Sequence, residues 1–306
     1  MKRVFKNFLL ISVAAAMFTA CGKDSDENEL EDDGADGVSV PVEKGAIKTS
    51  FSISEDKKVY FSMGNLQYQA STNTWRFAEH QYDMIGSDNQ FVLRSYSGWI
   101  DLFCYGTSGW DGGVAAYQPY TTSTNDDDFY RHGLLDINVN ADWGVYNKIS
   151  NGGNEAGMWR TLTYSEWSYM LHKRPNASDK KGVATIDGVS GLVILPDDWT
   201  LPKGVKFKSG LVASREQGFG GNNKYSLSEW RKMEAHGAVF LPAAGYREGT
   251  TVFSSDDAGC YWTATYRLAT PYHGTDELQF TCSYCQFVMY VKGYRASSVR
   301  LVQDVK

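Results

Sequence analysis

An acidic segment near the start of the chain most constrains what the chain can fold into. It runs over residues 22–37 as GKDSDENELEDDGADG, and residues 21–36 carry a net charge of −7. A segment with so many like charges and so few apolar side chains has nothing to bury, so it stays extended and solvated. We therefore expect residues 21–45 to form an acidic flexible tether and residues 46–306 to contain the packed core.

The first twenty residues have the features of a secretory signal peptide. Three basic side chains precede an apolar run over residues 8–18, which is too short to span a bilayer as a helix. The following Phe18-Thr19-Ala20-Cys21 resembles the lipobox of bacterial lipoproteins, which implies that Cys21 receives lipid. An uncleaved N-terminal anchor is the alternative. In both cases residues 46–306 lie outside the cytoplasm.

The acidic run directly after Cys21 also resembles the surface-export signal of some Gram-negative lipoproteins. A plain spacer accounts for the same residues equally well. We therefore expect an outer-membrane lipoprotein at the cell surface, attached to the membrane through lipid at Cys21. The choice between the inner and the outer face of that membrane stays open.

The composition of the chain predicts one globular domain over residues 46–306. Hydrophobic residues make up 42% and charged residues 22%, which excludes wholesale disorder. Aromatic residues reach 14% and glycines number 30, a mixture that favours short strands and loops over a helical bundle. The net charge of −6 argues against a nucleic-acid partner. No linker divides these residues, so we expect a single core.

Local patterns within this domain predict short strands and two helices. Alternating apolar and polar residues over 51–68, with a turn at 55–58, predict a hairpin. Each helix begins with a capping box, formed by Thr163 with Glu166 and by Ser226 with Glu229. Further strands are predicted over 192–195, 238–241 and 298–302. This mixture indicates the α+β class.

Three segments resemble the formylglycine-generating-enzyme branch of the C-type-lectin-like superfamily. They are Trp159–Trp167 (WRTLTYSEW), Tyr261–Thr265 (YWTAT) and Ser298–Val302 (SVRLV). The same pieces occur in the Fibrobacter major paralogous domain and in lectin-like variable proteins diversified by retroelements. The resemblance implies a C-type-lectin-like fold of short antiparallel strands, two helices and extensive loops. In that fold the N- and C-terminal strands pair, and a long loop region presents a binding face.

Two cysteines carry the main alternative, an enzyme. The resemblance implies that a sulfatase-modifying, formylglycine-generating enzyme would use Cys282 and Cys285, whose thiolates suit Cu(I). The family pair is more widely spaced and has different neighbours, so we expect no enzyme and no cofactor. Cys104 and Cys260 fit either a disulfide or two buried thiols. We interpret the acidic run Asn125–Asp128 as solvated loop residues rather than calcium ligands, and expect no metal site.

The segment over residues 265–296 has little periodicity, although it lies between two framework-like segments. In the retroelement-diversified proteins that it resembles, variable positions fall just before the final strand. Large amphipathic side chains such as Tyr give much contact area at a modest entropic cost. We expect a ligand-binding face for a protein or a glycan, lined by Tyr266, Arg267, Tyr272, His273, Asp276, Tyr284, Phe287 and Tyr290.

Leu278 and Phe280 of the same segment are predicted to point into the core. The function predicted from these residues is a lipid-anchored extracytoplasmic binding module or adhesin. The enzyme above and a structural component of the envelope or of a pilus tip are the alternatives.

Overall fold

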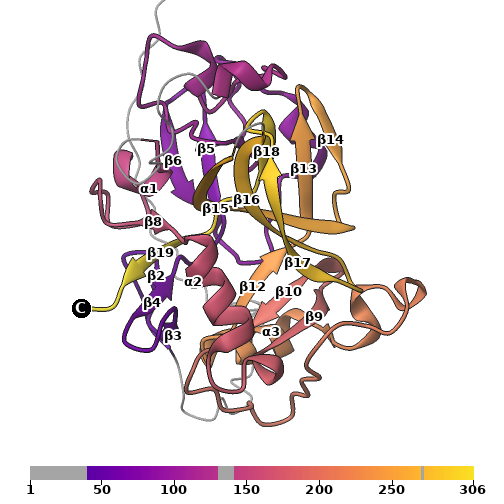
Figure 1. Ribbon diagram of the computed structural model, residues 1–306. Helices are drawn as coiled ribbons and strands as arrows, with labels where there is room; N and C mark the ends of the chain where they lie inside the picture. The colour runs from indigo at the N-terminus through magenta and orange to yellow at the C-terminus, as the bar shows by residue number, and fades with distance from the viewer. Residues whose placement is uncertain (1–39, 130–140, 270–271) are drawn as a thin grey trace, which may run out of the picture. The chain divides into compact units, whose positions relative to one another are not determined.

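Strands from the two ends of the folded part of the chain lie side by side. In the computed structural model, β4 (Lys58–Phe61) pairs antiparallel with β19 (Leu301–Asp304), and Phe61 lies opposite Val302. The strands β3 (Phe51–Ser52) and β8 (Arg160–Thr161) complete a sheet in the order β3-β4-β19-β8 (Figure 1). The expected hairpin is present, because β3 and β4 pair antiparallel, but its second strand ends at Phe61 and does not continue to residue 68.

The structure describes residues 40–129, 141–269 and 272–306. The predicted signal peptide, Cys21 and most of the predicted tether therefore lie outside the described residues. The helices and strands of these three ranges all belong to one unit, Asp36–Lys306. Strand β1 (Val42–Glu43) pairs with β2 (Ala46–Ile47), so regular structure begins before the boundary that we expected at residue 46.

The chain leaves β4 for a second hairpin and a long irregular region. Strand β5 (Leu66–Gln69) pairs with β6 (Thr74–Phe77), and the short β7 (Phe103–Cys104) follows. The described part of residues 86–157 is mostly turns, 3₁₀ segments and a four-residue helix, α1 (Trp143–Tyr146). The Trp143 side chain is fully buried, as expected of an aromatic ring that fixes a loop to the core.

A four-stranded sheet and a helix form another part of the fold. The strands run β11-β9-β10-β12, formed by β11 (Lys224–Tyr225), β9 (Lys181–Ile186), β10 (Val189–Ile194) and β12 (Val239–Pro242). Trp230 and Met233 of α3 (Leu227–Ala235) are fully buried in one apolar cluster with Val193 and Phe240 of this sheet. The strands predicted over 192–195 and 238–241 correspond to β10 and β12.

Both predicted capping boxes are present. Thr163 caps α2 (Tyr164–Ser168), and the Glu166 carboxylate accepts a hydrogen bond from the Thr163 backbone N–H at 2.8 Å. Ser226 and Glu229 make the same exchange at the start of α3. After Ser168 the helix continues as a π-helical turn over residues 169–173, so that Trp167, Met170 and Leu171 reach the core.

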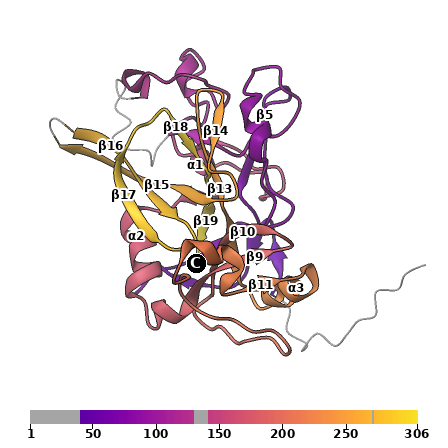
Figure 2. The same ribbon diagram turned by 90° about the vertical axis from the view of Figure 1, so that its right-hand side faces the viewer.

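The largest sheet contains the chain segment from which we predicted binding. Its order is β17-β16-β15-β13-β18-β7, and β14 (Thr251–Phe253) pairs with β13 (Ala244–Glu248). Three long strands form an antiparallel meander: β15 (Ala258–Ala269), β16 (Tyr272–Phe280) and β17 (Cys285–Val291). Figure 2 shows this meander projecting from the rest of the described residues. The short β18 (Arg295–Ser297) pairs with β13 and with β7.

The described residues form a mixed α+β fold of mostly strands, with three short α-helices. The third helix, α1, was not expected. The Asp142 side chain caps it by accepting a hydrogen bond from the Gly144 N–H at 2.9 Å. The final strand was expected to begin at Ser298, but it begins at Leu301. The intervening Arg300 is fully buried and donates a hydrogen bond to Gln81 at 2.7 Å instead of continuing a strand.

Candidate binding face

The meander places the predicted face residues on both of its sides. Successive residues of a strand point to opposite faces, and directly opposed residues of paired strands share a face. Arg267 lies opposite Gly274, so Arg267, Tyr272 and Asp276 share the face that looks toward α2. The other face carries Tyr266 and His273. The eight predicted residues therefore do not form one continuous surface.

An ion pair between Arg267 and Asp276 lies at the centre of the α2-facing side. The Arg267 Nε lies 2.7 Å from Asp276 Oδ1 and 2.8 Å from Oδ2, and the Arg267 guanidinium also reaches Oδ2 at 2.6 Å. The Asp276 side chain is fully buried, whereas 32% of the Arg267 side chain is exposed. Hydrogen bonding to Asp276 raises the pKa of Arg267, so the guanidinium stays charged and fixed in direction.

One aromatic ring contacts this guanidinium, and further rings lie on the same side of the meander. It lies 5.1 Å from the centre of the Tyr164 ring, within the range of a cation–π contact. The Tyr164 ring meets the Phe287 ring edge-to-face at 4.9 Å between centroids. On β16 and β17, the rings of Tyr272 and Tyr290 lie 6.0 Å apart. We use the term aromatic strip for six residues of this face: Tyr164, His172, Arg267, Tyr272, Phe287 and Tyr290.

Two members of the aromatic strip were missed by sequence reasoning. Tyr164 begins α2, and His172 lies in the π-helical turn that follows, with its ring 6.1 Å from that of Phe287. Burial lowers the pKa of His172, so its imidazole is neutral at pH 7. The two residues are eight positions apart, a spacing that places side chains on the same side of a helix. That spacing was the available signal, but we used the residues after Thr163 only to predict a helix.

The predicted residues on the opposite face have other surroundings. The Tyr266 ring lies 6.0 Å from that of Tyr105, at the edge of an apolar cluster. His273 Nε2 lies 3.0 Å from Asp126 Oδ2, and the Lys292 ammonium reaches the same oxygen at 2.7 Å. This ion-paired group ties the meander to the loop over residues 121–129.

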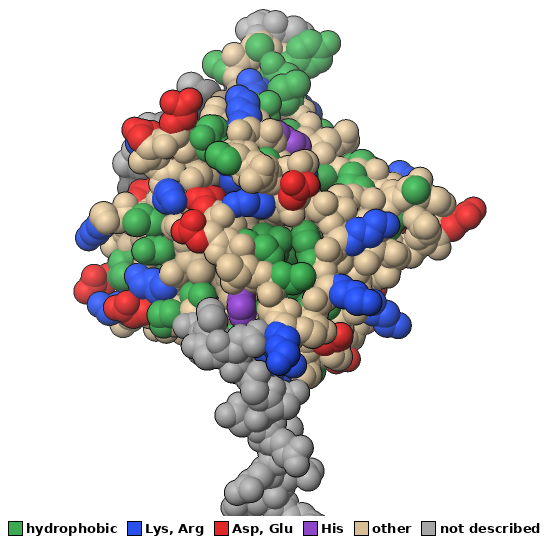
Figure 3. All heavy atoms as spheres, turned by 90° about the horizontal axis from the view of Figure 1, so that it is seen from below, with side chains coloured by type: hydrophobic (Ala, Val, Ile, Leu, Met, Phe, Trp, Pro, Cys, Tyr) green, Lys and Arg blue, Asp and Glu red, His purple; other side chains and the backbone are tan. Residues whose placement is uncertain are grey.

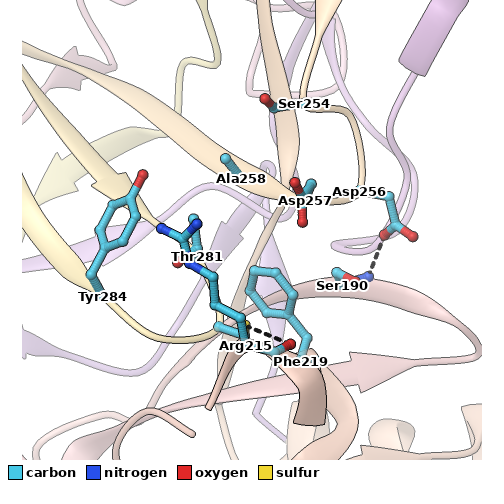
Figure 4. A pocket seen from close by; sticks show the side chains of 11 residues that line it. Ser190, Arg215, Phe219, Ser254, Asp256, Asp257, Ala258, Thr281 and Tyr284 are labelled. Carbon is cyan, nitrogen blue, oxygen red and sulfur yellow. Dashed lines mark hydrogen bonds between the residues drawn. The ribbon is translucent and has the colours of Figure 1, made fainter. Parts of the chain in front are cut away.

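Leu278 and Phe280 are fully buried, which confirms the prediction that they point into the core. The eighth predicted residue, Tyr284, lies at a separate cavity of about 340 Å³ beside the turn between β16 and β17. In Figure 4 the Arg215 side chain extends between the rings of Tyr284 and Phe219. Asp256, on the far side of the cavity, accepts a hydrogen bond from the Ser190 N–H at 2.8 Å. The cavity thus combines aromatic rings with exposed charges of both signs, and it suits a small polar ligand.

The four described cysteines are free thiols, so Cys104 and Cys260 do not form a disulfide. Burial raises the pKa of Cys104 and of Cys285 to about 11. Burial also raises the pKa of Cys260. Because the thiolate is the reactive and metal-binding form, these three groups are protonated and inert at neutral pH.

Two acidic side chains that we considered as calcium ligands, Asp126 and Asp128, bind other side chains of the protein. In the run Asn125–Asp128, Asp126 pairs with His273 and Lys292, and Asp128 accepts a hydrogen bond from Ser123 at 2.6 Å. Over residues 40–129, 141–269 and 272–306, no three His, Cys, Asp or Glu side chains gather closely enough to hold a metal ion. Within the same ranges no helix has the length and apolar character needed to span a bilayer.

Comparison with known proteins gives no relative on which to base an assignment. The chain matches no family model, no curated protein and no solved structure.

Proposed function

We propose that this chain is a lipid-anchored extracytoplasmic binding module that binds a protein or a glycan through the aromatic strip. The observation that carries the proposal is the Arg267 guanidinium, which the buried Asp276 fixes beside the Tyr164 ring. A fixed, partly exposed cation next to aromatic faces suits recognition of polar groups together with apolar surface. Because Asp276 already orients the guanidinium, little side-chain freedom is lost when a ligand binds.

Two features of the fold support the proposed C-type-lectin-like architecture. Strand β4, which is near the start of the described residues, pairs with the last described strand, β19, as the resemblance implies. Residues 261–265, which resemble the family strand, lie within β15 directly beside α2. Tyr164 N–H donates a hydrogen bond to Thr265 Oγ1 at 2.9 Å, which joins two of the three resembling segments.

The exposed side chains of the meander are where the proposal places sequence variation. Leu268, Tyr272 and Met289 are each more than half exposed, so a change there alters the surface without disturbing the core. Asp276 and Leu278 are fully buried and should stay constant. Deep sequencing of the 3′ end of the gene across a culture tests this. Substitutions confined to adenines in codons of the exposed positions support diversification by a retroelement, and an invariant segment contradicts it.

Single-residue variants test the aromatic strip as a binding face. The wild-type chain is first screened on glycan and protein arrays, and the affinity of the best ligand is measured by interferometry. We expect Tyr164→Ala and Tyr272→Ala each to weaken binding about tenfold, as residues of a contact centre do. Tyr146→Ala, at an exposed tyrosine of α1, is the matched control and should bind normally. Unchanged affinity in both strip variants, with intact folding by circular dichroism, would refute the proposed face.

A further inference from the structure

A concentration of positive charge lies on a part of the chain that the aromatic strip does not use. Residues 200–232 carry a net charge of +5, although residues 37–306 as a whole carry −2. Figure 3 views the molecule from below and shows several Lys and Arg side chains toward its right-hand side, besides others on the same face. A local field of one sign in an overall acidic body attracts anions to that place.

Three lysines of this segment line one hollow. Lys206, Lys208 and Lys224 border a cavity of about 730 Å³, together with Phe207 and Asn222. Its volume falls in the range of about 300–1,000 Å³ that is usual for ligand sites. Because low-dielectric walls focus the field of charges that line a hollow, the three ammonium groups act together on an anion inside it.

The backbone that carries these lysines is held by two buried side chains. The Asn223 side chain accepts a hydrogen bond from the Lys208 N–H and donates one to the Lys208 carbonyl, both at 2.8 Å. The Tyr225 hydroxyl donates to the Lys206 carbonyl at 2.8 Å. Lys224 itself lies in β11, which pairs in parallel with β9. The backbone is therefore held in place at each of the three positions, and the exposed lysine side chains extend from it.

The charges in this hollow are not neutralised by the protein. Among the described residues, no carboxylate lies within ion-pair distance of the ammonium groups of Lys206, Lys208 or Lys224. Glu229 borders the same hollow, and hydrogen bonds from the Ser226 N–H and hydroxyl lower the pKa of its carboxyl, so it sets one negative charge against the three positive ones. The hollow therefore keeps an excess of positive charge.

We infer that this hollow binds an acidic oligosaccharide whose sugar rings carry carboxylate or sulfate groups. Such a chain presents anions at intervals along a polar backbone, and its apolar ring faces can pack on Phe207. A concave site several sugar rings in size fits a glycan better than the broad surface of a membrane. The inference does not rest on the aromatic strip, so either can fail while the other holds.

Matched charge variants of the full chain test the inference. The first replaces the three lysines of the hollow (Lys206→Gln, Lys208→Gln, Lys224→Gln). The second replaces three exposed lysines elsewhere (Lys44→Gln, Lys57→Gln, Lys148→Gln), so the net charge falls equally. Fluorescence anisotropy measures binding of labelled hexasaccharides from heparin and from polygalacturonate, with a neutral dextran hexasaccharide for comparison.

We expect the wild-type chain and the control variant to bind an acidic hexasaccharide and not the neutral one, more weakly as salt is added. The hollow variant should bind at least about tenfold more weakly, because interactions with three ammonium groups are lost. Equal weakening in both variants would overturn the inference in favour of general charge attraction. Binding to vesicles containing phosphatidylglycerol, but to neither acidic hexasaccharide, would overturn it in favour of a membrane contact.

Discussion

Arg267 and Asp276 form a close ion pair of unequal exposure: the carboxylate is fully buried, whereas the guanidinium reaches solvent. The two residues belong to neighbouring strands, β15 and β16, and the pair therefore links the proposed binding side of the meander to its interior. Removing either partner leaves the other alone, but in very different surroundings. Substitution of Arg267 and substitution of Asp276 should therefore lower the free energy of unfolding by different amounts.

We predict that Arg267→Met destabilises the protein more than Asp276→Asn. In the first variant a buried carboxylate loses the cation that it pairs with, at a cost of about 3 kcal/mol. In the second, the guanidinium can turn into water, and the loss should be about 1 kcal/mol. Urea denaturation of both variants measures the free energy of unfolding. Equal losses, or a larger loss for Asp276→Asn, would contradict this account.

The backbones of β16 and β17 approach closely at Gly274, so a larger side chain at this position should destabilise the fold. Gly274 has a φ of +154°, and a Cβ atom there would lie 2.5 Å from the carbonyl carbon of Tyr290. We predict that Gly274→Ala pushes β16 from β17 and lowers the free energy of unfolding by about 2 kcal/mol. Gly112→Ala is the control, because no atom lies within 4 Å of its added Cβ. Thermal and urea denaturation of the two variants should differ clearly.

Burial of Asp101 predicts a dependence of stability on pH. Its pKa is raised by burial from 3.8 to about 6, even though its carboxylate accepts a hydrogen bond from Asn89 at 2.7 Å. A raised carboxyl pKa means that the folded state holds its proton more tightly, so stability falls as pH rises from about 4 to about 6.

The variant Asp101→Asn removes this titration. Its stability relative to wild type should therefore improve by about 2 kcal/mol between about pH 4.5 and pH 7.5, because the charged wild-type group is penalised only at the higher pH. Other buried acids titrate in both proteins and cancel in the comparison. A difference in unfolding free energy that stays constant with pH would show that Asp101 is ionised in the folded state throughout.

Three thiols, of the buried Cys104 and Cys260 and of the half-buried Cys285, should be unreactive in the folded protein. We predict that iodoacetamide at neutral pH labels Cys104, Cys260 and Cys285 only after guanidinium chloride is added, because burial keeps each thiol protonated. Mass spectrometry of peptides identifies the labelled positions. Rapid labelling of Cys285 in the native chain would instead reveal the thiolate that a cysteine enzyme needs.

Local signals in the sequence predicted local structure well. The capping boxes at Thr163 and Ser226 fix helix starts through contacts only three residues apart, so one chain segment contains all the information. The four-residue α1 escaped prediction because its stability comes from burial of Trp143 and not from helical periodicity. The final strand was placed too early because Arg300 finds its partners in distant segments.

The sequence indicated which segment contains the candidate site, but not which of its residues lie together in space. The segment over 265–296 shows little alternation because β16, the middle strand, is covered on both faces over part of its length. Asp276 and Glu277 are both fully buried, with partners on β15 and β18. No spacing rule predicts such pairs. Tyr164 and His172 join the face only because α2 packs against the meander, which is a tertiary contact.

The pairing of β19 with both β4 and β8 has a consequence for the timing of folding. Strand β19 lies between these two partners, and it follows β4 in the chain by some 240 residues. The sheet cannot close until β19 has been synthesised, so the edge of β4 that does not pair with β3 lacks its partner until then. Under the proposed export of the chain, the native fold can form only after β19 has crossed the membrane and reached β4.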